Sequence, residues 1–265
     1  MAKTMADEAP ARTDGSGTAG PGGGNHVASR PLGTVRAVRV VLLHALPFDG
    51  SMWRAEQQAL PAGTLAPTLY RLGTTLEEWA HGVLDLAGHE PFVVVGCSVG
   101  GSCALEVARA APDQVEGIVL VGAKAGVRPD TAFRDEAVRL LSDGGMKAGW
   151  LAYWRRLFGT GTPEDIIATA RDMAMAQDVD DVIRGVRAFH NRGDGTDFAR
   201  AWPGQIVVVC GDQDRTPSPS TAAAIADAPH RRFHLVRNCG HYVNLERPTE
   251  FRRLLTEATE QFSRR

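Results

Sequence analysis

An apolar run at residues 92–95 leads directly into a G-x-S-x-G pattern at residues 96–100, and this junction constrains the fold more than any other feature of the chain. The run, which is rich in valine, indicates a parallel strand that is buried on both faces. Apolar residues at helical spacing follow it as far as Pro112, through which a helix cannot continue. A strand, a sharp turn and a helix in this order hold a serine in a strained conformation that exposes its hydroxyl group. The pattern therefore predicts Ser98 as a nucleophile.

This strand, turn and helix resemble the nucleophile elbow of the α/β-hydrolase superfamily, and two later motifs agree with the resemblance. Residues 205–210 form another apolar run that leads to Asp214, and residues 232–236 are a further strand candidate that leads to His241. In that superfamily the acid follows a late strand, and the histidine comes after it. The resemblance thus implies that Asp214 and His241 complete a catalytic triad with Ser98.

The three residue types of such a triad depend on one another chemically. A serine hydroxyl is a weak nucleophile unless a neighbouring imidazole accepts its proton, and the carboxylate holds that imidazole in the required tautomer. Asp212 lies at the same strand end and is the alternative acid. If it has no catalytic role, it is a solvated carboxylate at the end of the strand. No carboxylate closely follows the apolar run at residues 117–121, where some family members carry the acid. Each residue alone also has an ordinary explanation as a turn or surface residue, but their joint order favours a triad.

A fourth motif lies upstream, where an apolar run at residues 38–43 ends in the sequence His-Ala-Leu-Pro at residues 44–47. This motif looks like the H-G-x-P loop of the superfamily. By that resemblance, the backbone N–H groups of Leu46 and Val99 form an oxyanion hole. Ala45 stands where the family has glycine, and its methyl group restricts the backbone of this loop.

Strand-like and helix-like segments alternate from Arg36 onward, which is the pattern of an α/β fold. Thr75 and Glu78 have the spacing of a capping box that opens a helix, and Gly88 ends it. A last helix is predicted to begin near Pro248. The predicted fold class is α/β, with a doubly wound, mostly parallel sheet of the α/β-hydrolase type.

The same reading predicts a domain organisation. Residues 35–123 and 204–265 are expected to form the α/β core. Residues 124–203 show helical periodicity without clear strands, and this insertion resembles the helical cap of the superfamily. Residues 1–34 are rich in Gly, Ala, Ser and Pro, and we expect a disordered tail there because this composition cannot bury apolar surface.

A cap over the nucleophile would form a substrate pocket and exclude water. Trp150 and Trp154, together with Met173 and Tyr242, are predicted to contribute to its wall, although most aromatic residues of the insertion are expected to pack against the core. An apolar or aromatic substrate follows as a hypothesis. Two roles remain open for the Lys124 side chain: it binds a substrate carboxylate, or it is simply solvated.

The composition excludes several other classes of protein. The formal net charge is −2 and the basic residues occur only in short clusters, so no nucleic-acid surface is predicted. No apolar run has the length of a membrane span, and no signal-peptide core is present, so a cytoplasmic protein is expected. The four cysteines lack metal-ligand spacing and are predicted to be buried free thiols rather than disulfides. We therefore expect a small-molecule substrate with no metal and no cofactor, and leave the oligomeric state open.

The predicted function is a cofactor-free serine hydrolase that cleaves a carboxylic ester or lactone through an acyl-enzyme. Carbon–carbon bond hydrolases, thioesterases and perhydrolases use a similar triad and remain alternatives, and residues 238–241 are similar to motifs of the carbon–carbon group. Epoxide hydrolases and haloalkane dehalogenases carry aspartate at the position of Ser98, which disfavours them. A non-catalytic ligand-binding receptor is the alternative from another class, and the intact triad argues against it.

Overall fold

The computed structural model describes residues 38–127 and 130–263, so the tail expected at residues 1–34 lies outside the described residues. Five strands form one sheet, in which each strand pairs in parallel with the next along the chain. This sheet confirms the predicted α/β class. The strands are β1 (Arg39–Leu43), β2 (Phe92–Cys97), β3 (Val115–Val121), β4 (Gln205–Gly211) and β5 (Arg231–Val236).

The strands differ in burial according to their place in the sheet. Every residue of β2 and β4 is buried, as expected of apolar strands that are covered on both faces. At one edge, β5 carries charged and half-exposed residues and presents only Val236 fully to the core. At the other edge, Leu65 forms an isolated parallel bridge with Val41. The central strands thus fix the positions of the loops that follow them.

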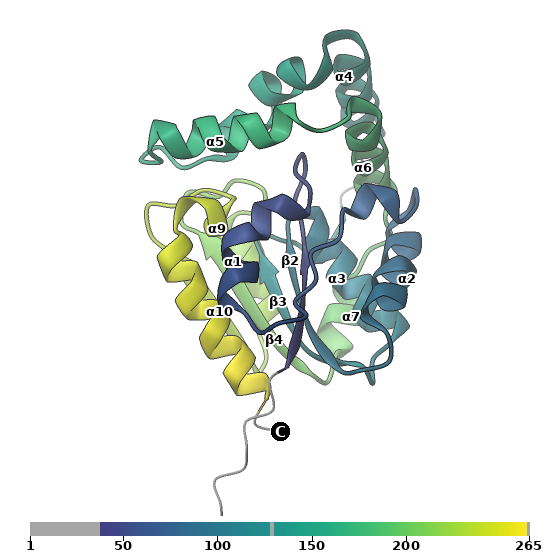
Figure 1. The fold of residues 1–265 in the computed structure, drawn as a ribbon, viewed down its shortest axis with the longest axis vertical. Coiled ribbons are helices and arrows are strands. Elements are labelled where there is room, and N and C mark those ends of the chain that lie inside the picture. Colours follow the sequence, from purple (N-terminus) through teal and green to yellow (C-terminus); the bar gives the residue numbers. More distant parts are fainter. Residues whose placement is uncertain (1–37, 128–129, 264–265) are drawn as a thin grey trace, which may run out of the picture. The chain divides into compact units, whose positions relative to one another are not determined.

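Helices cover both faces of the sheet (Figure 1). One face carries α2 (Leu76–Ala87), α3 (Val99–Ala110) and α7 (Thr196–Ala201), and the other carries α1 (Arg54–Ala59) and α10 (Pro248–Phe262). The remaining elements of the core are short. They are η1 (Gly50–Trp53), η2 (Leu69–Arg71), α8 (Pro219–Ala223), η4 (Ala224–Ala226) and α9 (Val243–Glu246).

The helix signals of the sequence act largely as predicted. The Thr75 side chain accepts a hydrogen bond from the Glu78 N–H and caps α2. The Glu78 carboxylate bonds Thr74 rather than Thr75, so the predicted capping box is only half formed. In α10 the residues at helical spacing face the core, and each fully buried leucine or phenylalanine side chain contributes about 1.5–3 kcal/mol. They are Phe251, Leu254, Leu255, Ala258 and Phe262.

The chain between β3 and β4 is helical, and its described residues contain no strand. It comprises α4 (Thr131–Ala152), η3 (Trp154–Leu157), α5 (Glu164–Met175), α6 (Val179–Asn191) and then α7. Figure 1 shows α4, α5 and α6 grouped beyond one end of the sheet. Across the described parts of the chain, no helix has the length and apolar character that crossing a membrane requires.

Candidate active site

Ser98 occupies a strained turn between β2 and α3. Its φ of 55° and ψ of −117° lie outside the regions that L-residues favour, and its N–H donates to the Val121 carbonyl at 2.9 Å. A Cβ at Gly96 would meet the Gly100 carbonyl oxygen at 2.2 Å, and one at Gly100 would meet the Leu43 oxygen at 2.2 Å. The strand and helix can therefore approach this closely only because these positions are glycines.

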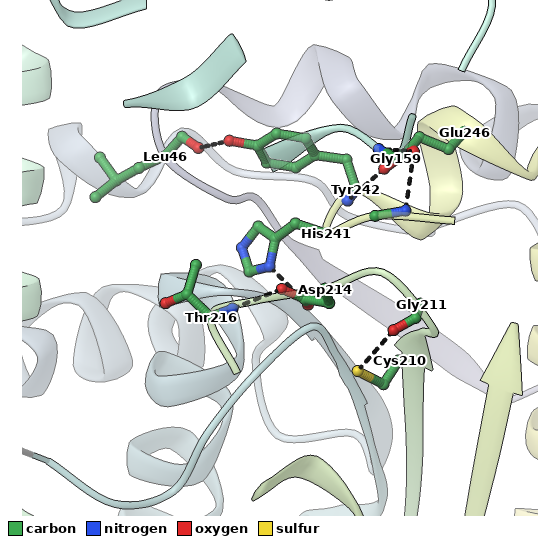
Figure 2. A network of polar contacts seen from close by, with 10 residues as sticks. Leu46, Gly159, Cys210, Gly211, Asp214, Thr216, His241, Tyr242 and Glu246 are labelled. Atoms are coloured by element: carbon green, nitrogen blue, oxygen red, sulfur yellow. Dashed lines mark hydrogen bonds and ion pairs between the residues drawn. The ribbon is translucent and has the colours of Figure 1, made fainter. Parts of the chain in front are cut away.

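Asp214 and His241 are brought together by the loops that follow β4 and β5. Nδ1 of His241 lies 2.9 Å from Oδ2 of Asp214, and both side chains are buried (Figure 2). The other carboxylate oxygen of Asp214 accepts a hydrogen bond from the Thr216 N–H at 2.8 Å. The backbone N–H of His241 donates to the Leu157 carbonyl at 2.8 Å. A buried carboxylate with two donors is thus arranged to orient the imidazole.

The side chain of Asp212, the alternative acid, contacts Cys239 and Arg237 rather than His241. Its Oδ1 accepts a hydrogen bond from the Cys239 N–H at 3.1 Å, and its Oδ2 lies 3.9 Å from a guanidinium nitrogen of Arg237. The Asp212 side chain therefore supports the loop that precedes His241 rather than the imidazole itself.

Ser98 and His241 line one pocket, with a volume of about 490 Å³. This size is typical of a small-molecule site. Leu46 also lies on its wall. Within the described residues, no hydrogen bond joins Ser98 to His241, and such bonds in unliganded sites commonly tighten only when substrate binds.

The loop after β1 is fixed by two buried side chains. His44 is fully buried, and its Nε2 accepts a hydrogen bond from the Leu69 N–H at 2.9 Å. Burial lowers the pKa of His44 to about 4, so the ring is neutral at pH 7. The Tyr242 hydroxyl donates to the Leu46 carbonyl at 3.0 Å (Figure 2). Ala45 is accommodated without a positive φ.

Two backbone donors of the elbow and of this loop have no acceptor in the described chain. They are the N–H groups of Leu46 and Val99, the pair expected to form an oxyanion hole. The first N–H groups of a helix have no partner inside that helix, which accounts for Val99. Leu46 lies on the pocket wall, whereas Val99 is fully buried and is not among the residues that line the pocket.

The four predicted pocket residues have different placements. Trp154 lies on the pocket wall, whereas Trp150, Met173 and Tyr242 are not among the lining residues. Trp150 packs against Phe158 with ring centroids 5.9 Å apart. Tyr242 is fully buried, and its ring contacts the His241 ring edge-on. The other aromatic side chains of the wall are Phe133, Tyr153 and Phe189, of which the sequence reasoning did not identify Phe133 and Phe189.

The thiol beside Ser98 is not available for reaction. Cys97 is fully buried, and burial raises the pKa of its thiol far above the ordinary value. All four cysteines are free and buried, as predicted. Among the residues described, no group of three or more His, Cys, Asp or Glu side chains is arranged to hold a metal ion.

Sequence reasoning assigned no role to Glu246, whose buried carboxylate joins two distant segments (Figure 2). It accepts hydrogen bonds from the N–H groups of Gly159 at 2.8 Å, Gly240 at 3.0 Å and Tyr242 at 3.2 Å, and from the Thr162 hydroxyl at 2.5 Å. Its place just after the histidine was the only signal in the sequence, because Gly159 and Thr162 are remote along the chain.

Comparison with known proteins places the chain among hydrolases. A model of the alpha/beta hydrolase family matches residues 40–254. A 2-hydroxymuconate semialdehyde hydrolase of Pseudomonas putida is 28% identical over 67% of this chain, and the match spans 66% of that protein, just under two thirds of its length.

Solved structures show the same fold. A thermophilic esterase from Thermogutta terrifontis has a TM-score of 0.79 at 23% identity, covering 85% of this chain and 90% of that one. The enol-lactonase from Burkholderia xenovorans LB400 has a TM-score of 0.74 at 21% identity, covering 83% and 90%.

Proposed function

We propose that this chain, which belongs to the alpha/beta hydrolase family, is a serine hydrolase that cleaves a carboxylic ester or lactone through an acyl-enzyme. The observation that carries the proposal is the buried hydrogen bond of 2.9 Å between His241 and Asp214, at the wall of a pocket that Ser98 also lines. A nucleophile on a strained elbow beside an oriented imidazole is the arrangement that acyl transfer requires.

In the proposed mechanism, the Ser98 hydroxyl attacks the substrate carbonyl and its proton passes to Nε2 of His241. The Nδ1 contact with Asp214 leaves Nε2 as the nitrogen for this transfer and stabilises the imidazolium. The imidazolium then protonates the leaving alkoxide, and an acyl-Ser98 ester remains. Water attacks that ester with His241 again accepting a proton, which releases the carboxylic acid and restores the hydroxyl group.

The N–H groups of Leu46 and Val99 are proposed to donate to the oxyanion of each tetrahedral intermediate. The lack of an acceptor for either group within the described chain supports this assignment. Loss of one such donor commonly lowers kcat by about 10²–10³-fold. We also propose that the helical insertion at residues 124–203 acts as a cap through η3, α4 and α6, which contribute much of the pocket wall, whereas α7 near its end packs against α3 on one face of the sheet.

The pocket wall supports an apolar or aromatic substrate portion. Its aromatic and aliphatic residues are Leu46, Phe133, Leu141, Tyr153, Trp154, Leu157, Val186 and Phe189. A small molecule of the cytoplasm is the proposed substrate, and the four reduced cysteines are consistent with that compartment.

Carbon–carbon bond hydrolysis is the second candidate, because of the 28% identity to a 2-hydroxymuconate semialdehyde hydrolase. The two candidates differ in substrate and share the three site residues. A screen that pairs aryl esters and lactones with vinylogous diketones distinguishes them by the ratio of kcat/KM values.

The test of the hydrolase proposal is covalent labelling by a fluorophosphonate probe together with turnover of p-nitrophenyl esters. Ser98→Ala is expected to abolish both. Ser102→Ala is the matched control, because Ser102 lies in α3, the helix that follows Ser98, and its buried hydroxyl has no partner within the described chain. A folded wild-type protein that neither labels nor turns over any ester would contradict the proposal.

A further inference from the structure

The charged residues of the pocket are unequal in sign. Among its described lining residues, four are basic and one is acidic. The acid, Asp130, is exposed and caps α4 by accepting a hydrogen bond from the Phe133 N–H at 2.9 Å. The basic residues are Lys124, Arg156, Arg192 and Arg215. An excess of positive charge in a concave, partly apolar site attracts anions.

Arg192 differs from the other bases because it is buried, with 9% of its surface exposed. Its guanidinium donates to the carbonyl oxygens of Phe189 and Gly126, and its Nε is buried without an acceptor within the described chain. No carboxylate of the described chain lies within ion-pair distance of it. Asp194, two residues later, accepts hydrogen bonds from Val127 and Thr196 instead.

A buried cation without a carboxylate partner is unfavourable for folding alone. Burial lowers the pKa of Arg192 to about 10, so the side chain still carries its charge at neutral pH. Within the described chain, its aromatic partner is Phe189, with the guanidinium carbon 3.9 Å from the ring centroid. At the wall of the pocket, the charge of Arg192 is thus met by this ring, two carbonyl oxygens and the nearby charge of Asp194, but by no described carboxylate within ion-pair distance.

The same positive charges act on His190, two residues before Arg192. Burial and the nearby charges of Arg192 and Lys124 lower the pKa of His190 to about 4. A neutral imidazole therefore lies beside the guanidinium on the pocket wall and can donate one further hydrogen bond.

We propose that the pocket binds a substrate with a carboxylate remote from the scissile bond, and that Arg192 is the residue that binds this carboxylate. The inference rests on the proposed hydrolase function. The apolar wall would hold the middle of such a substrate, while Ser98 and Arg192 act on its two ends. Guanidinium and carboxylate groups form paired hydrogen bonds that are stronger than bonds between neutral groups.

The alternative explanation is structural: Arg192 follows α6, and its bond to the Phe189 carbonyl helps to end that helix. If Arg192 were purely structural, any preference of the pocket for an anionic substrate would persist after its replacement. The two explanations therefore predict different substrate preferences when Arg192 is replaced, although both allow a loss of protein stability.

The experiment compares p-nitrophenyl monoesters of glutaric, adipic and pimelic acids, which carry a free carboxylate, with their methyl esters, which are neutral. Wild type is expected to prefer the best acid monoester over its methyl ester by at least about tenfold in kcat/KM, the effect of one charge-assisted hydrogen bond. In Arg192→Met this ratio should fall toward one. Arg187→Met is the control, since Arg187 is exposed on α6, the helix that Arg192 follows, and does not line the pocket.

Equal kcat/KM values for both ester types in wild type, or an unchanged preference in Arg192→Met, would overturn the proposal. If that variant does not fold, inhibition of wild type decides: the best dicarboxylate must inhibit at least about tenfold more strongly than its diamide. Calorimetry with Ser98→Ala tests the anion site independently of the hydrolase function. If the dicarboxylate binds to this variant while wild type is not labelled by the fluorophosphonate, the hydrolase proposal is wrong and the anion site stands.

Discussion

Oε2 of Glu246 accepts a hydrogen bond from the backbone N–H of Gly159 at 2.8 Å, so a buried carboxylate close to His241 holds the segment that follows η3. The same oxygen accepts the Gly240 N–H, directly before the histidine. One side chain thus sets the spacing between the helical segment and the loop that carries the proposed base (Figure 2).

Glu246→Gln is expected to lower kcat by about tenfold and the free energy of unfolding by about 2 kcal/mol. The amide nitrogen would face an N–H donor in place of an oxygen, and one buried donor would lose its acceptor. Ester turnover and urea unfolding measure the two effects. Glu257→Gln, at an exposed site paired with Arg253, should change neither value appreciably. Full activity in Glu246→Gln would show that the network does not position His241.

The two aspartates after β4 form a second matched pair. Asp214→Asn is expected to lower kcat by about 10³–10⁴-fold, because an amide at this position favours the wrong histidine tautomer. Asp212→Asn should change kcat by less than about threefold, since an amide oxygen can still accept the Cys239 N–H. Steady-state kinetics with one p-nitrophenyl ester decide the question. A larger loss in Asp212→Asn would transfer the role of the acid to that residue.

Gly122 tests how closely the backbone approaches the Asp214–His241 pair. It has a φ of +51°, and a Cβ there would lie 2.8 Å from the His241 carbonyl oxygen and 3.0 Å from its Nδ1. Gly122→Ala is expected to reduce kcat/KM by at least about tenfold, since small displacements of catalytic groups are costly.

Gly63→Ala provides the control for backbone strain alone. Gly63 also has a positive φ, of +91°, but a Cβ there would have nothing within 4 Å. We expect a loss of about 1 kcal/mol in the free energy of unfolding and unchanged kinetics. If both variants lost activity equally, the contact at Gly122 would not be the cause.

The buried carboxyl group of Glu56 is expected to make the protein less stable as the pH rises. It is buried in α1 with one carboxylate oxygen lacking a partner in the described chain, and burial raises its pKa from 4.5 to about 7, an effect that Arg252 partly offsets. Because the folded-state pKa is the higher one, the folded state binds more protons than the unfolded state between these values. The contribution of Glu56 to stability is therefore full below about pH 4.5 and is lost as pH rises through 7.

Glu56→Gln should consequently stabilise the protein at pH 8 by about 3 kcal/mol more than it does at pH 4.5. Urea unfolding of both proteins at both pH values measures this double difference, in which other titrating groups cancel. A stability difference that is the same at pH 8 and pH 4.5 would show that Glu56 is not raised in pKa.

The sequence predicted the strands well, because each depends on local signals. The buried runs before Ser98 and Asp214 are apolar throughout, and a covered parallel strand requires that composition. Which aspartate contacts His241 was not decidable from spacing, since both lie on the same loop. The hydrogen bonds of Asp212 and Asp214 separate them only in three dimensions.

The pocket wall was harder to predict because it depends on where a helix ends. Trp150 and Trp154 are four residues apart and would share a face of one continuous helix. However, α4 ends at Ala152, and the backbone of Tyr153, with φ −121° and ψ −59°, redirects the chain before η3. Trp154 therefore lines the site while Trp150 packs elsewhere. Arg192 was also not identified, because a single arginine gives no sequence signal of burial.

The hydrogen bond from the His241 N–H to the Leu157 carbonyl limits how this enzyme can be redesigned. Exchanging the whole helical segment for one from a relative, to change specificity, would replace the Leu157 carbonyl that accepts the hydrogen bond from His241, the proposed base. A chimera that keeps residues 157–162 as a graft boundary would retain this acceptor and both segment-side partners of Glu246. New specificity should therefore be introduced on either side of that boundary and not across it.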